Sequence, residues 1–232
     1  MKNNIVYFQS IYNDHPNIFT SSKNLLPDWY KKTRSFVGGS PQIDNLHLKT
    51  FKPCIPFLDA MTSGYMILLP CDIYIGQTEL GPIVKWNMED AVIVKERDPG
   101  INKSLPTPPG CHDSHFVWML PVSISIPKKH SMLITHPFNR FDLPFVTTSG
   151  IVDGDNFSLY GNGSIPFFIS KDFNGIIPAG TPIVQVFPFK RKKWRSKIDK
   201  NLNTKADYYR RLSSARFINW YKENCWIKKI YD

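Results

Sequence analysis

The sequence contains no run of about 18 apolar residues, the length that a membrane-spanning helix needs. Its first five residues, Met-Lys-Asn-Asn-Ile, also lack the apolar stretch of a secretory signal peptide. These two absences predict a protein that has no membrane partner and an intracellular location.

Motifs of several common enzyme classes are missing too. The chain has no glycine-rich phosphate loop, no Gly-x-Gly-x-x-Gly turn and no Gly-x-Ser-x-Gly elbow. It also lacks the histidine and paired-cysteine pattern of zinc nucleobase deaminases. We therefore expect neither a dinucleotide enzyme, nor an α/β hydrolase, nor a zinc deaminase.

Cysteine is scarce, and the four cysteines form no Cys-x-x-Cys pair, which argues against a disulfide framework. One string, Cys111-His112-Asp113-Ser114-His115, gathers thiol and imidazole donors in a loop. These donors make Cys111, His112 and His115 a candidate metal site, although the string lacks a second ligand pair at ordinary zinc spacing. The alternative is a polar loop in which His115 begins a strand.

The chain is rich in residues that favour strands. Its 19 prolines and 14% aromatic residues argue against a helical bundle, because proline interrupts helices and aromatic rings suit half-buried strands. A hydrophobic content of 42% over 232 residues is enough to build a core. We predict a mainly all-β protein.

Short apolar runs bounded by prolines predict short strands in a sandwich or barrel. The predicted strands after residue 115 are 117–119, 122–126, 132–135, 151–152, 165–169 and 183–186. Upstream we expect a strand at 5–8, a turn and short helix within 22–32, two strands within 49–75, and a hairpin of 84–86 with 91–94. Pro188 is predicted to end this β-rich core.

Charge divides the chain unevenly. The net charge is +10, and residues 189–232 carry 14 Lys or Arg against 4 Asp or Glu, so the remaining residues are neutral as a set. A capping-box-like string at 204–207 and apolar residues at helical spacing predict a helix over 205–224. We expect an N-terminal arm (1–48), a β-rich core domain (49–188) and a basic, aromatic C-terminal helical tail (189–232).

The basic tail is typical of a protein that meets a polyanion. Its densest part mixes cations with an aromatic ring, and we predict nucleic-acid or acidic-partner contacts there for Lys190, Arg191, Lys192, Lys193, Trp194 and Arg195. The alternative is that the tail docks on its own domain or on a neighbouring subunit.

Three strings occur in the order of motifs of the trimeric dUTPase and dCTP deaminase family. Ser63-Gly64-Tyr65-Met66-Ile67 resembles its first motif, residues 149–155 (Ser-Gly-Ile-Val-Asp-Gly-Asp) resemble its acidic turn, and residues 180–185 (Gly-Thr-Pro-Ile-Val-Gln) resemble a later motif. The resemblance implies a β-clip or jelly-roll-like body. It also implies that Asp153 contacts a nucleotide sugar and positions water, and that Gln185 helps to hold the nucleotide.

Departures from the family pattern argue that catalysis has been lost. Met66 stands where the first motif has Asp, and Asn156-Phe157-Ser158 replaces the family's Tyr-Arg-Gly. Phosphate-transfer chemistry depends on donors that neutralise phosphate charge. Asp153 therefore remains a candidate catalytic residue, while the predicted ligand-binding residues are Asp153, Asp155, Gln185, Arg140, His136 and Tyr65.

Two further polar features are open to two interpretations. His136, Asn139, Arg140 and Asp142 could form a pocket over the Asp153 turn, or Arg140 could pair with an aspartate and pin a loop. Asp59 lies in a hydrophobic run, so it is either a structural cap or a site residue.

The string from Pro56 to Arg191 also resembles an uncharacterised family from marine phages and bacteria, which adds no catalytic residue. This resemblance implies a cytoplasmic location in a bacterial or infected host cell, or a virion-associated one. The leading function is a dUTPase-like domain that binds a nucleotide or other phosphate-bearing ligand as a homo-oligomer, possibly a trimer, with Mg²⁺ on the nucleotide phosphate as the candidate cofactor. The alternative is a phage structural or assembly protein whose basic tail contacts nucleic acid or an acidic partner.

Overall fold

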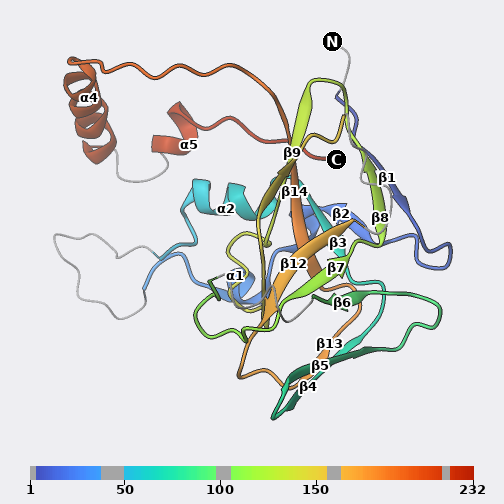
Figure 1. Cartoon of the computed structure of the whole chain (residues 1–232). Helices are drawn as coiled ribbons and strands as arrows, with labels where there is room; N and C mark the ends of the chain where they lie inside the picture. The colour runs from blue at the N-terminus through green and yellow to red at the C-terminus, as the bar shows by residue number, and fades with distance from the viewer. Residues whose placement is uncertain (1–3, 38–49, 98–105, 156–162, 216–219) are drawn as a thin grey trace. The chain divides into compact units, whose positions relative to one another are not determined.

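The computed structural model describes residues 4–37, 50–97, 106–155, 163–215 and 220–232 (Figure 1), apart from the side chains of residue 205 and residues 212–215. Strands are the main elements, which confirms the predicted all-β character. The chain divides into two compact units. The first, called the β body, comprises Met1–Pro27, Met61–Arg191 and Tyr231, and the second unit comprises Asp28–Ala60, Lys192–Ile230 and Asp232.

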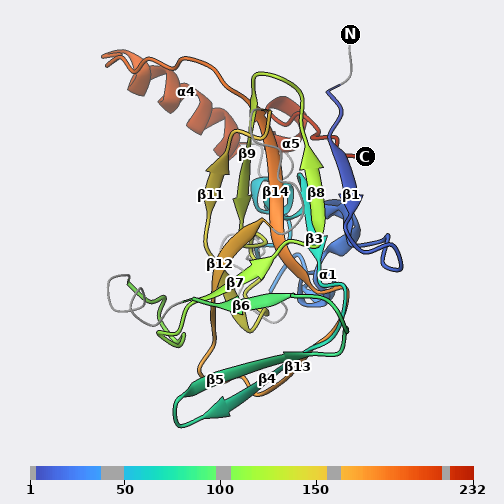
Figure 2. The ribbon, with the colours of Figure 1, turned by 45° about the vertical axis from the view of Figure 1, so that its right-hand side comes forward.

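The described strands pair in antiparallel fashion and form four sheets, ordered β1-β8, β10-β12-β7-β6, β11-β9-β14-β3-β2 and β13-β4-β5. Figure 2 shows β11, β9 and β14 side by side. The strands are β1 (Tyr7–Ser10), β2 (Phe19–Ser21), β3 (Tyr65–Leu68), β4 (Ile73–Thr78), β5 (Gly81–Trp86), β6 (Val94–Glu96), β7 (Phe116–Met119), β8 (Val122–Ser125), β9 (His130–Thr135), β10 (Phe145–Thr147), β11 (Gly150–Val152), β12 (Ser164–Ile169), β13 (Gly175–Ile177) and β14 (Pro182–Lys190).

One apolar cluster joins the four sheets of the β body. At its centre Trp118 of β7 is fully buried and stacks on Phe167 of β12, with ring centroids 3.6 Å apart. The indole N–H of Trp118 donates to the hydroxyl of Thr147 at 3.1 Å, so its one polar atom has a partner. The β body is therefore held by a single core rather than by separate small ones.

All six strands predicted after residue 115 are present, and β14 extends past Pro188, where the sequence predicted the end of the core. The N–H of Arg191 donates to the carbonyl oxygen of Lys129, on the β9 side. Because alternate residues of a strand direct their N–H groups to opposite sides, the N–H that Pro188 lacks would have pointed away from β9. β14 pairs with β3 only as far as Val186, so no ladder bond is lost at Pro188.

Two predictions for the first half of the chain are corrected. The range 49–75, predicted as two strands, also contains the helix α2 (Ile55–Thr62). The predicted hairpin of 84–86 with 91–94 is wrong, because β5 pairs with β4 while β6 pairs with β7. Alternating patterns mark strands but do not choose their partners.

The helices near residue 22 agree with the sequence. A 3-10 helix, η1 (Ser22–Leu25), lies in the β body, and α1 (Asp28–Lys32) begins the second unit. Within the second unit, Lys52 donates to the carbonyl oxygen of Tyr30 at 2.6 Å and lies over the ring of Tyr30, 4.3 Å from its centroid. These contacts tie α1 to the segment that precedes α2.

Asp59 of α2 has a structural partner set within the second unit. Its Oδ2 accepts the indole N–H of Trp226 at 2.8 Å and the ammonium of Lys229 at 2.7 Å. The sequence left open whether Asp59 is a structural cap or a site residue. In the structure its carboxylate holds the C-terminal segment, and these two donors compensate its charge.

Helical residues are described at both ends of the helix predicted over 205–224: α4 (Leu202–Ala215) and α5 (Trp220–Asn224). Residues 216–219 lie outside the described residues, so the continuity of the predicted helix is not tested. Among the helices that the structure describes, no helix is both long and apolar enough to cross a membrane.

Candidate functional site

The predicted ligand-binding residues fall into two groups along β14. Gln185 lies within β14, opposite Thr135 of β9. Arg191, just beyond the end of β14, is six residues further along, or about 20 Å at 3.3 Å per residue, and it is Arg191 that contacts Asp153 and Asp155. The structure therefore brings Asp153 and Asp155 together and leaves Gln185 elsewhere.

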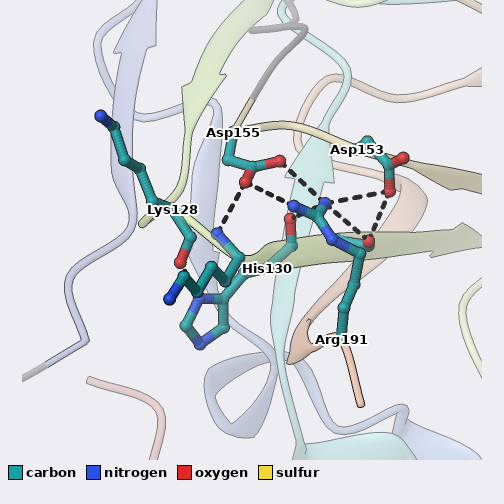
Figure 3. Close-up of polar contacts among 7 residues, drawn as sticks. Lys128, His130, Asp153, Asp155 and Arg191 are labelled. Atoms are coloured by element: carbon teal, nitrogen blue, oxygen red, sulfur yellow. Dashed lines mark hydrogen bonds and ion pairs between the residues drawn. The ribbon is translucent and has the colours of Figure 1, made fainter. Parts of the chain in front are cut away.

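Arg191 is the centre of the first group, which Figure 3 shows. Its Nη1 donates to Oδ1 of Asp155 at 2.8 Å and its Nη2 donates to Oδ2 at 2.6 Å. Nη1 also donates to the carbonyl oxygen of His130 at 2.8 Å and lies 3.1 Å from Oδ1 of Asp153. A two-pronged guanidinium–carboxylate pair is the strong form of this contact, so Arg191 is held in one orientation.

Asp155 is the more enclosed of the two aspartates, with its side chain 5% exposed. The backbone N–H of Lys129 donates to its Oδ2 at 2.6 Å. The hydrogen bond from Arg191 is the main reason that the pKa of this carboxyl falls from 3.8 to about 2, and desolvation opposes the shift. Asp155 is therefore a fixed anion whose oxygens already have donors.

Asp153 is more open, with its side chain 58% exposed. Its Oδ1 accepts the hydroxyl of Ser131 at 2.6 Å as well as the ion pair with Arg191. The acid that the resemblance singles out thus lies at a bend and is accessible to solvent, while its nearest cation is shared with Asp155.

Packing explains the glycine between these two aspartates. A Cβ atom on Gly154 would lie 2.5 Å from Cε of Met132 and 3.2 Å from Cδ1 of Ile126. A larger residue here would have to displace the flexible end of Met132, so glycine lets the turn lie close against the core. This packing accounts for the glycine without a ligand.

Gln185 is fully buried, and both ends of its amide have partners. Its Oε1 accepts the N–H of Phe138 at 2.8 Å, and its Nε2 donates to the carbonyl oxygen of Ser63 at 2.7 Å. The amide joins the loop after β9 to the turn before β3. In this structure Gln185 connects backbone segments rather than lining an opening.

His136 and Arg140 lie in the loop after β9. The N–H of Thr147 donates to Nδ1 of His136 at 3.3 Å, so Nδ1 is unprotonated, and Nε2 lies 3.2 Å from the carbonyl oxygen of Arg140, to which it donates. Burial lowers the pKa of His136 from 6.5, in agreement with this neutral form. Arg140 pairs with Asp142 through Nε at 2.9 Å and Nη2 at 2.8 Å, which is the loop-pinning arrangement.

Tyr65 makes ring contacts within the β body. Its ring centroid lies 5.0 Å from that of Phe8 and 5.8 Å from that of Tyr231. The preceding Gly64 has φ +75°, and a Cβ there would lie 2.3 Å from the carbonyl oxygen of Val186. The first family-like string is therefore explained by a tight turn under β14.

The candidate metal site is not formed within the described part of the chain, where no group of three or more His, Cys, Asp or Glu side chains is placed to hold a metal ion. Cys111 is buried, which raises the pKa of its thiol. His115 is buried with its ring edge-on to Phe168, 4.6 Å away. The Nε2 atoms of His112 and His115 are buried without a hydrogen-bond partner, and nothing in the structure explains this.

The predicted polyanion-contact residues divide at Arg191. Lys190 ends β14 and Arg191 is ion-paired, whereas residues 192–200 are all exposed. We call residues 192–200 the basic segment; it carries five Lys or Arg and one Asp. Its backbone runs from Lys192 to Asp199 without a turn or bend, visible in Figure 1 as the stretched trace before α4.

Sequence reasoning missed Ser131 and Lys129, which hold the two aspartates, and it assigned Arg191 to the tail. Asp155 and Arg191 are 36 residues apart, and the residues near them contain no motif that joins them. Only the register of β9 with β14, which places Lys190 opposite His130, would have shown the contact.

No model of a known protein family matches the chain, and no curated protein is found to be similar to it.

Proposed function

We propose that this protein binds a polyanion through the basic segment, residues 192–200, and that the polyanion is nucleic acid. The observation that carries the proposal is that Lys192, Lys193 and Arg195 are exposed and carry no ion pair that the structure describes, whereas the adjacent Arg191 is paired with two aspartates. Cations that no acid neutralises attract phosphates and release their counterions.

The charge pattern of the two units supports this proposal. The positive excess of the chain begins after β14, where the β body ends. A neutral body with a cationic segment concentrates its field on one part of the molecule. In this proposal the β body is a scaffold, as in a phage structural or assembly protein. Self-association as a homo-oligomer would bring several basic segments together, and a trimer is the form to test.

The test is the salt dependence of binding to a labelled 20-nucleotide oligo(dT) by fluorescence anisotropy. We expect affinity to fall steeply with salt, and the triple variant Lys192→Ala, Lys193→Ala, Arg195→Ala to reduce the slope of log K against log salt by about 0.7 for each lost phosphate contact. Light scattering on the same samples gives the oligomeric state.

The matched control removes three exposed lysines of the β body, Lys85, Lys95 and Lys171. Its net charge equals that of the segment variant, so a nonspecific charge effect would lower both slopes alike. Equal loss in the two triple variants, or binding that does not respond to salt, would rule out the basic segment as the binding site.

A second candidate, nucleotide binding by a dUTPase-like β-clip body, is favoured by one observation, the exposed carboxylate of Asp153 at the bend after β11. By the resemblance, Asp153 would contact the nucleotide sugar and position water, while Mg²⁺ would be carried by the nucleotide phosphate. Calorimetry with dUTP and dCTP, with and without Mg²⁺, tests it. Heat of binding that Asp153→Asn abolishes would support this candidate, and no heat with either nucleotide would remove it.

A further inference from the structure

Trp194 is unlike the other tryptophans of the chain. Trp194 is 85% exposed, whereas the remaining five are buried or half-buried. A single exposed apolar residue is ordinary on a protein surface. Its neighbours make the difference, because Lys192 and Lys193 precede it and Arg195 and Lys197 follow it.

Cations and apolar groups alternate with one another along one exposed stretch of chain. Residues 192–199 contain no turn or bend, and all of them are exposed. Trp194 and Ile198, which is 97% exposed, lie in this stretch together with Lys193, Arg195 and Lys197. Exposed cations interspersed with exposed apolar groups match a ligand that carries both charges and flat apolar faces.

The anchoring of Arg191 gives this surface a fixed start. The side chain of Arg191 donates two hydrogen bonds to Asp155, and its backbone N–H donates to the carbonyl oxygen of Lys129, just before β9. The basic segment therefore begins next to a residue that is held in place. Holding one end lowers the conformational entropy that binding would otherwise remove.

An unpaired nucleic acid strand has the required chemistry. Its phosphates form a charged row, and its bases expose faces on which an indole stacks, which is how proteins bind single strands without reading sequence. In a duplex the bases stack on one another and their faces are closed to a side chain on an extended segment. An acidic polypeptide offers carboxylates but no regular row of planar groups for Trp194.

We infer that the ligand of the basic segment is single-stranded nucleic acid, with Lys193, Arg195 and Lys197 on the phosphates and Trp194 stacked on a base. This inference rests on the proposed function, because it assumes that the segment binds a polyanion. It adds the class of polyanion and the residue that recognises it.

The experiment compares two oligonucleotides that have the same phosphates and differ only in their bases: a labelled 12-nucleotide oligo(dT) and a 12-nucleotide abasic strand. Binding of the full-length protein to each is measured by anisotropy at one salt concentration. We expect oligo(dT) to bind about tenfold more tightly, the effect of one stacked base. Trp194→Ala should remove this preference and leave abasic binding unchanged, while Trp194→Phe should keep most of it.

Phe141 supplies a control that is matched in exposure. Phe141 is 82% exposed and lies in the β body, outside the basic segment. Phe141→Ala should leave the tenfold preference intact, and Trp194→Ala should leave the affinity for a 12-base-pair duplex unchanged, because the base faces of a duplex are closed to the indole.

The outcomes separate this inference from the proposed function. Salt-dependent binding of both strands with equal affinity overturns base stacking and leaves polyanion binding in place. Base stacking is also overturned if Trp194→Ala weakens duplex binding as much as oligo(dT) binding, if poly-glutamate competes as well as oligo(dT), or if Phe141→Ala loses as much as Trp194→Ala. Failure of every polyanion to bind overturns the proposed function itself.

Discussion

The β body and the basic segment use the same kinds of residue in opposite ways. Trp118 is fully buried against Phe167, whereas Trp194 is almost fully exposed. Arg191 is ion-paired with Asp155, whereas Arg195, four residues later, is exposed. Residue type alone therefore does not assign a role in this protein, because the same kind of ring or cation stabilises the fold in one region and is available to a ligand in the other.

The largest expected effect contrasts the two tryptophans. Trp118→Ala should lower the free energy of unfolding by about 3–5 kcal/mol, because it removes a buried ring from the core. Trp194→Ala should change it by less than about 0.5 kcal/mol, because an exposed ring contributes little to folding. Urea unfolding of the two variants measures both values, and similar losses would break the contrast between the regions.

The second-largest effect on the free energy of unfolding contrasts Gln185 with Asp153, two residues of the family-like strings. Gln185→Leu leaves the N–H of Phe138 and the carbonyl oxygen of Ser63 without this partner, so we expect a loss of about 2 kcal/mol or more. Asp153→Ala removes a contact that is largely exposed, and its cost should stay below about 1 kcal/mol. Chemical denaturation measures both losses in the free energy of unfolding. A larger loss for Asp153→Ala than for Gln185→Leu would contradict the expectation that the buried amide of Gln185 contributes more to stability than the exposed carboxylate of Asp153.

The pH dependence of the β body should include His136. Because burial lowers its pKa in the folded protein, the unfolded chain binds the proton more readily. Stability should therefore be fully present above pH 6.5 and decline as the pH falls below that value. Thermal melts at pH 7.5 and 5.0 measure this decline, which should be smaller in His136→Asn; an equal decline in the variant would assign the pH dependence to other groups.

The smallest effect concerns Asp155 and Arg191. The folded pKa of Asp155, about 2, lies below its ordinary value of 3.8, so its ion pair stabilises the fold above pH 3.8 and that stabilisation is lost as the pH falls through about 2. The melting temperatures of the wild type and Asp155→Asn should differ at pH 5 and converge between pH 4 and pH 2. A gap that persists at pH 2 would show that the carboxylate charge is not its source.

Much of the fold could be predicted because strand formation in this chain is a local property. Val117-Trp118-Met119 and residues 165–169 show the apolar and aromatic pattern of strands, and both lie in strands. The pairing of β5 could not be predicted in this way. β5 pairs with β4, and β6 pairs with β7. The choice of partner depends on contacts across the sheet, which the alternating pattern of a strand does not encode.

The candidate site was predictable only in part. Asp153 and Asp155 were found from a short string, but their partner Arg191 was assigned to the tail because it stands in a run of cations. Tyr65 and Gln185 were found from similar strings, yet their contacts lie inside the β body. A motif locates residues along the chain, and burial decides whether they face a ligand or the core.

Strand propensity and net charge are sums over neighbouring residues, so the β-rich character of this protein and the position of its charge follow from the order of its residues. Which cations are neutralised depends instead on the folded chain. The register of β9 with β14 brings Arg191 to Asp155, and it leaves Lys192, Lys193 and Arg195 beyond the last strand. Ion pairing depends on distances of a few ångströms between residues far apart in the chain, and only folding sets those distances.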